Sequence, residues 1–203
     1  MKRAKTPSRK AEQSAATLER VMIASMDLFA RQGIHATSMD QIAERARLTK
    51  GAIYWHFRSK NALLDAILKR IKEEWQRVVL LRVREGATPL VKVESLFASY
   101  GTLLSEHPEM CLFLQRAMLE PNTSVSRKVN DVFDRTATAI ATVFDEGKDS
   151  GLFLKRSDSR VLAFAVLSSF AGAVTHCHSD KTLRFADLMD EIKSQTVARL
   201  TGA

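Results

Sequence analysis

The sequence has few of the residues that build cross-links and metal sites. It contains only 2 cysteines among 203 residues, Cys111 and Cys177. Two thiols are too few for the disulfide framework of a small secreted protein, and their spacing matches no zinc motif. The basic N-terminus lacks the apolar stretch and cleavage site of a secretory signal. These absences favour a reduced, cytoplasmic protein.

Catalytic motifs are also missing. There is no G-x-S-x-G, no phosphate-binding glycine loop and no metalloprotease pair of His and Glu. The run HCH at residues 176–178 could suggest a metal site, but side chains two apart on a helix diverge. His107 lies four residues before Cys111, yet it precedes Pro108 and is expected to cap the next helix. We therefore expect no enzyme, no metal and no cofactor.

Helix breakers are scarce, with 8 Gly and 4 Pro in the whole chain. Apolar residues recur at helical spacing, and alternation with period two is absent. The fold class predicted is all-α. Helices are expected near residues 17–32, 39–46, 50–56, 60–84, 89–105, 108–119, 123–147, 158–177 and 182–200.

The longest stretch without a charged residue is 161–179. It has nearly the length of a membrane span, but its continuous apolar character ends near Val174 and polar residues interrupt it. We interpret it as a core helix of a soluble protein and expect no membrane partner.

The charge is unevenly distributed. Residues 1–72 hold 15 Lys and Arg against 6 Asp and Glu, a net of +9, whereas the whole chain has +8. Almost all the excess therefore lies in the first third, which indicates an acidic polymer or surface as its partner. A basic end that only keeps the protein soluble would explain the tail, but not the whole block.

The segment 48–57, LTKGAIYWHF, carries the functional prediction. It follows a short helix with a capping pattern at Ser38 and Gln41, so the two helices match a helix-turn-helix. Ile53 and Phe57 are four residues apart on the helix, so both can face inward against Ile42 and Phe29. The remaining residues then face outward, where aromatic, hydroxyl and cationic groups suit contacts with DNA. Taken one at a time, each of these residues is better explained as completing the core, capping a helix or lying in solvent, but together, in a basic third of the chain, they favour contact with nucleic acid.

Residues 20–68 closely resemble the DNA-binding domain of the TetR family of bacterial transcriptional regulators. The resemblance rests on LFARQGIHATSMDQIAERARLTKGAIYWHFRSKNALLDAIL, with F-x-x-x-G, T-S-x-x-x-I-A, T-K-G-x-x-Y-x-H-F and S-K-x-x-L in order. Beyond about residue 75 the chain resembles the family only in length and helical texture. The domains implied are a disordered basic arm at 1–14, a helix-turn-helix domain at 15–62, and an effector-binding and dimerisation domain at 63–203.

The resemblance implies contacts with double-stranded operator DNA for a set of residues around the two short helices. They are Thr37, Ser38, Arg47, Thr49, Lys50, Gly51, Ala52, Tyr54, Trp55, His56 and Lys60. Arg47 departs from the pattern, because the family commonly has glycine at this turn. If the turn needs a positive φ, arginine costs about 1 kcal/mol there.

The resemblance also implies a homodimer, with the two recognition helices on a palindromic site. The expected interface lies on the last two helices and includes Ala165, Ser168, Ser169, Gly172, His176, Phe185, Leu188, Met189 and Ile192. A single packed monomer core is the alternative for these apolar and small residues.

The resemblance further implies a small, often hydrophobic effector that binds among the middle helices. The candidate residues are Phe97, Tyr100, Leu104, Met110, Phe113, Leu114, Met118, Phe133 and Phe164, although such stripes more often form core than cavity. The function expected is a repressor, released by its effector, that controls efflux or a catabolic or lipid pathway. The alternative is a helical interaction protein whose basic end binds lipid or another polyanion.

Overall fold

The computed structural model describes residues 9–120 and 124–202, and its elements in these ranges are all helical. In chain order they are α1 (Arg9–Gln32), α2 (Met39–Arg45), α3 (Lys50–His56), α4 (Lys60–Trp75), the π-helical turn η1 (Gln76–Leu80), α5 (Leu81–Glu85), α6 (Pro89–Glu106), α7 (Pro108–Met118), α8 (Ser124–Asp149), α9 (Ser159–Ser179) and α10 (Phe185–Thr201). The prediction of an all-α fold is confirmed.

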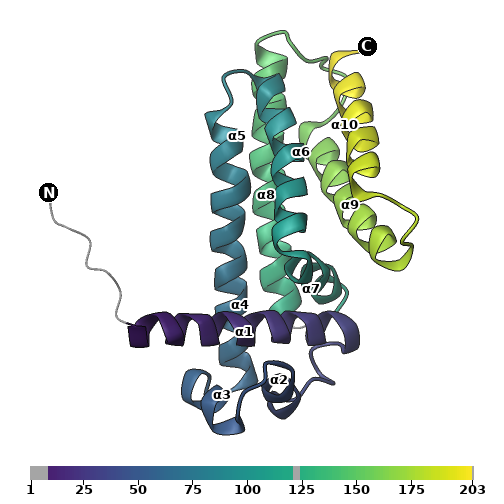
Figure 1. Cartoon of the computed structure of the whole chain (residues 1–203). Helices are drawn as coiled ribbons and strands as arrows, with labels where there is room; N and C mark the ends of the chain where they lie inside the picture. Colours follow the sequence, from purple (N-terminus) through teal and green to yellow (C-terminus); the bar gives the residue numbers. More distant parts are fainter. Residues whose placement is uncertain (1–8, 121–123, 203) are drawn as a thin grey trace, which may run out of the picture.

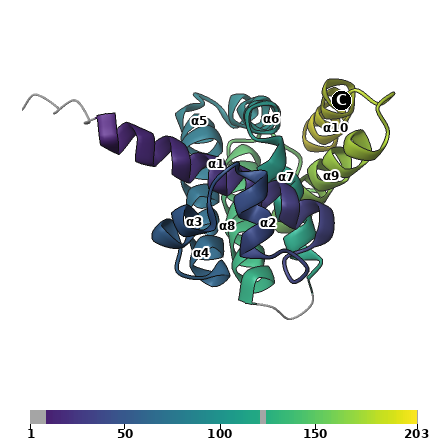
Figure 2. The ribbon, with the colours of Figure 1, turned by 60° about the horizontal axis from the view of Figure 1, so that its bottom comes forward.

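Helices α1, α2 and α3 form a small bundle at one end of the molecule (Figure 1). Helices α4 and α5 continue each other through η1 and make one long rod, which starts in the bundle and runs along the larger domain beside α8. Seen from the bundle end, α1 crosses the molecule and packs on α7 (Figure 2). The rod therefore belongs to both domains.

The core of the bundle is built as the sequence predicts. Phe29, Ile42 and Ile53 are fully buried, and Phe57 is 6% exposed. The ring of Phe29 also lies 5.9 Å from that of Phe113 on α7, centroid to centroid. The apolar core thus continues from the bundle of α1, α2 and α3 into the C-terminal domain.

Helix α1 begins at Arg9, eight residues before the expected start at 17. The segment 9–16 has no apolar anchor, but it also has no Gly or Pro and is rich in Ala, Glu, Gln and Lys, which propagate a helix well. The expectation of a disordered arm is therefore wrong for residues 9–14. The rest of that arm, residues 1–8, lies outside the described residues.

Helix α9 is unusual in leaving much of an apolar surface uncovered. Among the described residues it is the one helix long and apolar enough to cross a membrane by length and composition, a test that soluble core helices also pass. Only 33% of its most apolar window is buried, and Val161 and Phe164 are 68% and 38% exposed. This helix is therefore more exposed than the core helix expected from the sequence.

Candidate nucleic-acid interface

Helix α3, the expected recognition helix, is held by an N-terminal cap and by one inward residue. The hydroxyl oxygen of Thr49 accepts a hydrogen bond from the backbone N–H of Ala52 at 3.2 Å, which caps the helix as predicted. Ile53 is its one buried residue. Phe57, directly after the helix, packs into the same core. The other side chains of α3 are thereby turned outward.

Helix α2 is fixed by a reciprocal pair of hydrogen bonds. Ser38 Oγ accepts from the N–H of Gln41 at 3.1 Å, and Gln41 Oε1 accepts from the N–H of Ser38 at 2.8 Å. This is the predicted capping box. Ser38 itself is exposed at the N-terminus of α2.

The turn between the two helices contains a strained residue. Arg47 has φ 54°, the left-handed region that costs a side chain energy and that glycine adopts freely. The Arg20 guanidinium donates to the carbonyl oxygens of Ala46 and Arg47, the latter at 3.0 Å. The backbone strain expected at Arg47 is therefore present. The hydrogen bonds from Arg20 of α1 stabilise the strained turn.

The outward face of α3 is aromatic. Tyr54 and Trp55 are 42% and 76% exposed, and the half-buried ring of His56 meets Trp55 edge to face at 4.6 Å between centroids. Ala52 is also half-buried and Gly51 is exposed. A Cβ added at Gly51 would meet no atom of the described chain within 4 Å, so the fold itself leaves room there for another molecule.

Two of the expected DNA contacts are engaged inside the protein. The ammonium of Lys60 donates to the carbonyl oxygens of Ile34 and Thr37 at 2.8 and 2.9 Å, and the Thr37 side chain is buried, donating to Gly33. Both residues fix the loop between α1 and α2. Their expected phosphate contacts stay predictions, and these bonds favour a positioning role instead.

Lys50 is exposed and paired. Its Nζ lies 2.8 Å from Asp40 Oδ2 on α2, and this hydrogen bond raises the pKa of Lys50. The lysine is therefore a full cation that must leave, or share, Asp40 to meet a phosphate. Asp40 and Arg20 carry no sequence signal for these roles, because each meets its partner only once the turn between α2 and α3 has formed.

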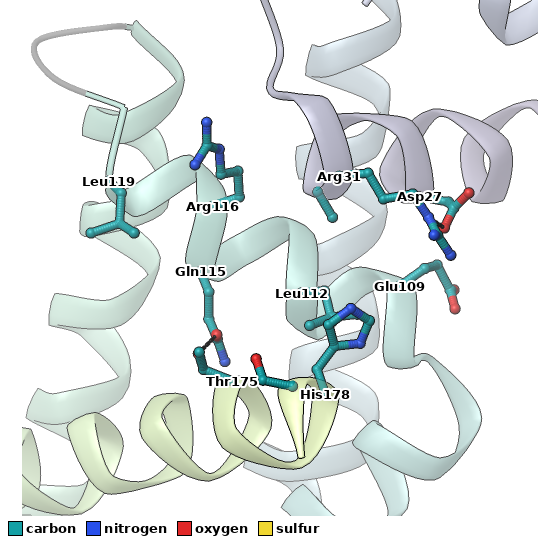
Figure 3. Close-up of a pocket in the computed structure, with 11 residues that line it drawn as sticks. Asp27, Arg31, Glu109, Leu112, Gln115, Arg116, Leu119, Thr175 and His178 are labelled. Atoms are coloured by element: carbon teal, nitrogen blue, oxygen red, sulfur yellow. Dashed lines mark hydrogen bonds and ion pairs between the residues drawn. The ribbon is translucent and has the colours of Figure 1, made fainter. Parts of the chain in front are cut away.

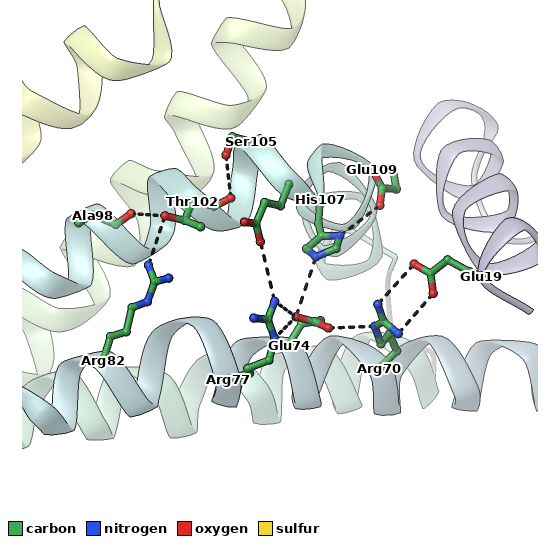
Figure 4. Close-up of polar contacts among 11 residues, drawn as sticks. Glu19, Arg70, Glu74, Arg77, Arg82, Ala98, Thr102, Ser105, His107 and Glu109 are labelled. Carbon is green, nitrogen blue, oxygen red and sulfur yellow. Dashed lines mark hydrogen bonds and ion pairs between the residues drawn. The ribbon is translucent and has the colours of Figure 1, made fainter. Parts of the chain in front are cut away.

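A chain of ion pairs joins the bundle to the C-terminal domain (Figure 4). Arg70 on α4 contacts Glu19 of α1 at 3.3 Å and Glu74 at 3.2 Å. Glu74 also pairs with Arg77 at 2.7 Å and lies 3.9 Å from His107, at the junction of α6 and α7. His107 stands at the cap position but its side chain makes no capping bond, so the expected cap is wrong.

A cleft of about 200 Å³ lies where α1, α7 and α9 meet (Figure 3). On one side the Asp27 carboxylate pairs with Arg31 and Arg45; burial opposes ionisation, but these two hydrogen bonds hold the pKa of Asp27 below its usual value. On the other side Gln115 bonds Ala171 and Thr175 of α9. The cleft thus lies between the bundle and the C-terminal domain, and the polar contacts on each side of it stay within one domain.

The structure does not bring all nine expected effector residues together. Met118, Phe133 and Phe164 line one cavity of about 410 Å³ between α7, α8 and α9, and Phe97 lines a separate groove between α6 and α10. Leu104 is half-buried against the core, and the others are buried in it: Tyr100, Met110, Phe113 and Leu114.

The expected dimer residues lie on α9 and α10, where Phe185 and Ile192 also pack against the core of the same chain. Met189 is 6% exposed and belongs to its own core. The rest are exposed or half-buried: Ala165, Ser168, Ser169, Gly172, His176, Phe185, Leu188 and Ile192.

Among the described residues, no group of three or more His, Cys, Asp and Glu is placed to hold a metal ion.

Comparison with known proteins supports the sequence motifs. Residues 22–67 match the model of bacterial regulatory proteins of the tetR family. The HTH-type transcriptional regulator TtgW of Pseudomonas putida is 38% identical over 107 residues, 46% of this chain and 80% of TtgW.

Solved structures of other regulators share the fold, among them FadR and AibR. FadR from Bacillus subtilis in complex with stearoyl-CoA has a TM-score of 0.74 at 19% identity, covering 89% of this chain and 98% of that one. AibR in complex with isovaleryl coenzyme A and operator DNA has a TM-score of 0.70 at 21% identity, covering 91% and 98%. With its helix-turn-helix motifs in place on this fold, the chain belongs to the TetR family of bacterial regulatory proteins and is a DNA-binding transcriptional regulator.

Proposed function

We propose that this cytoplasmic protein is a homodimeric repressor that binds a two-fold symmetric operator and leaves it when a small apolar effector enters the C-terminal domain. The observation that carries the proposal is the outward face of α3. A helix with one buried residue, Ile53, presents Tyr54 and Trp55 beside the cation of Lys50. Such a surface gains from an acidic partner with flat apolar edges, and the DNA major groove offers both.

Within this proposal the residues divide by role. Tyr54, Trp55 and His56 contact the groove and its walls, and Gly51 and Ala52 let the backbones approach. Ser38, Thr49, Lys50 and Arg47 supply hydroxyl groups and cations for phosphates and base edges. Thr37 and Lys60 hold the loop that sets the angle of α2.

A dimer follows from the needs of recognition and from the uncovered surface of α9. One seven-residue helix contacts too few base pairs for specificity, so two copies are needed, about 34 Å apart on the same face of the duplex. The exposed stripe of small residues on α9 lets a second copy approach closely, and the apolar side chains Val161 and Phe164 gain from being covered.

The effector proposal draws on the C-terminal cavities and on two relatives of the same fold. FadR and AibR were solved with stearoyl-CoA and isovaleryl coenzyme A, which makes acyl thioesters the first compounds to test and a lipid or catabolic pathway the first expectation. The rod from α4 to α5 and the ion pairs of Glu74 give an effector a mechanical route to α3.

The test is to select fragments of the source genome on the purified protein and to measure their binding with and without stearoyl-CoA or isovaleryl-CoA. The proposal predicts enrichment of a two-fold symmetric sequence and weaker binding when an effector is present. If no sequence is enriched, and vesicles of anionic lipid bind wild type and Tyr54→Ala equally, the basic end is a polyanion-binding surface instead.

A further inference from the structure

A groove runs between the bundle and the C-terminal domain. The cleft of about 200 Å³ between α1, α7 and α9 adjoins a wider hollow of about 600 Å³ that extends to the turn after α2. Both are lined by Asp27 and Arg31 of α1, Glu109 and Leu112 of α7, and His178 of α9 (Figure 3). Together the two hollows form the α1–α7 groove, which is separate from the cavities of the C-terminal domain.

The lining of the α1–α7 groove is basic. Five arginines stand against two carboxylates, an excess of three positive charges with His178 neutral. The arginines are Arg20, Arg31, Arg45, Arg47 and Arg116. Asp27 is already neutralised by Arg31 and Arg45, at 2.7 and 2.8 Å, and Glu109 is the remaining negative charge of the lining. An anion therefore gains electrostatic energy on entering the groove.

The groove also has apolar walls. Ile23 lines the wider hollow and Leu119 the narrower one, and these side chains are 42% and 77% exposed. Leu112 lines both hollows and is half-buried. Exposed apolar side chains gain from being covered, and an inorganic ion covers little of their surface. The groove therefore suits an anion that carries an apolar body.

We propose that the α1–α7 groove binds a small aromatic carboxylate through its guanidinium groups, in particular that of Arg31, the arginine that lines both hollows. Guanidinium groups pair with carboxylates through two parallel hydrogen bonds and stack on aromatic rings, so they recognise both parts of such a molecule.

The bound acid contacts the bundle through α1 and the turn after α2, and the C-terminal domain through Leu112 and His178. It therefore opposes a change in the angle between the two domains. This inference goes beyond the proposed function, because the site needs neither operator DNA nor an effector in the C-terminal cavities.

The first test compares 2-naphthoate with 2-naphthamide, which share the ring system and differ in charge. Calorimetric titration of the full chain should show that the acid binds about tenfold more tightly than the amide. Acetate, which lacks the apolar body, should not compete. The cavity lined by Met118, Phe133 and Phe164 has Asp134 and no Lys or Arg in its lining, so binding there would not favour the anion.

The second test removes a cation from the groove. Arg31→Gln should weaken the binding of 2-naphthoate about fivefold or more and leave that of 2-naphthamide nearly unchanged. The matched control is Arg135→Gln on α8, outside the groove. Both arginines pair with an aspartate four residues earlier, and their side chains are 63% and 69% exposed. The control should keep the affinity of the wild type.

The third test removes the negative charge of Glu109. Glu109→Gln should tighten the binding of 2-naphthoate about two- to threefold, because the repulsion between the two carboxylates is lost. A gain in affinity cannot result from partial unfolding, so this variant stays decisive if Arg31→Gln folds poorly. Glu106→Gln, at the end of α6 and outside both hollows, is the control and should change nothing.

Equal affinities for the acid and the amide, competition by acetate, equal losses in the two arginine variants, or no gain in Glu109→Gln would each overturn the inference. The arginines would then serve the fold or DNA alone. Operator binding measured on the same samples separates this failure from that of the proposed function. A protein that binds its operator without preferring the acid refutes only the groove site, whereas one that prefers the acid but binds no operator refutes only the repressor.

Discussion

Helices α3 and α9 both expose apolar groups, yet they do so in different chemical settings. On α3 the exposed groups are aromatic and lie near Thr49, Lys50 and Arg47. On α9 they are Val161 and Phe164 beside a stripe of Ala, Ser and Gly. The first setting suits a charged polymer with apolar edges, and the second suits another protein surface.

The two helices also differ in how they are held. Helix α3 has seven residues and depends on a cap and on Ile53, whereas α9 has 21 residues and buries one whole side. A short helix fixed by a few contacts can be moved by the rod that follows it. The comparison therefore predicts that α3 is the responsive surface and α9 the permanent one.

The largest expected effect is loss of the single inward residue of α3. Ile53→Ala removes a fully buried side chain and should lower the free energy of unfolding of the bundle by about 2–5 kcal/mol, with loss of DNA binding. Chemical denaturation measures it. Ile23→Ala, at a 42% exposed site on α1, should change stability far less, and equal losses would contradict the assignment.

The second-largest effect is expected for a charge placed on the exposed side of α9. Ala165 is exposed in the single chain, so Ala165→Asp should fold normally but place a charge in the dimer interface. We expect the dimer to weaken by about 3 kcal/mol or more, seen as a shift to monomer by light scattering. An unchanged dimer would remove α9 from the interface.

On α3, Tyr54→Ala should cost about 1–3 kcal/mol of operator affinity with little change in fold. The matched control is Leu152→Ala, because Leu152 and Tyr54 are 43% and 42% exposed. Titration of labelled operator measures both variants. If the two lose affinity equally, the outward face of α3 has no special role.

A smaller gain in stability is expected from a substitution in the turn between α2 and α3. Arg47→Gly relieves the positive φ and should raise the free energy of unfolding by about 1 kcal/mol, while removing a cation from the DNA surface. Arg58→Gly, an exposed arginine without a positive φ, should not stabilise. Destabilisation by Arg47→Gly would mean that the side chain contributes more than the strain costs.

The smallest effect sharpens the role of Lys50. Asp40→Asn frees this cation and removes a negative charge from α2, so operator affinity should rise about two- to threefold at low salt. Glu44→Gln, also exposed on α2, is the control. The salt dependence of binding separates the two, and a lower affinity for Asp40→Asn would show that the pair must stay closed.

The parts of the fold that could be predicted from the sequence are those determined by residues three or four apart. The cap at Thr49, the capping box of Ser38 and the inward pair Ile53 and Phe57 are of this kind, and each is confirmed. The strain at Arg47 could also be predicted, because arginine stands where the family commonly has glycine.

The rest depends on contacts between distant residues. Lys60 meets carbonyls more than twenty positions earlier, and Arg20 reaches the turn after α2. The sequence predicts a cation at position 60 but not its partner, so a surface role was the natural expectation. The π turn likewise has no local signal, because no Gly or Pro marks it and packing against α6 accompanies it.

The central claim is that α3 of each of two copies lies in the major groove of one operator. Hydroxyl-radical footprinting of the dimer on a selected genomic fragment tests it most directly. The account predicts two symmetric protected patches about one helical turn apart, about 34–36 Å, both lost with Tyr54→Ala. Uniform protection without sequence preference at moderate salt, the same for wild type and variant, would contradict it.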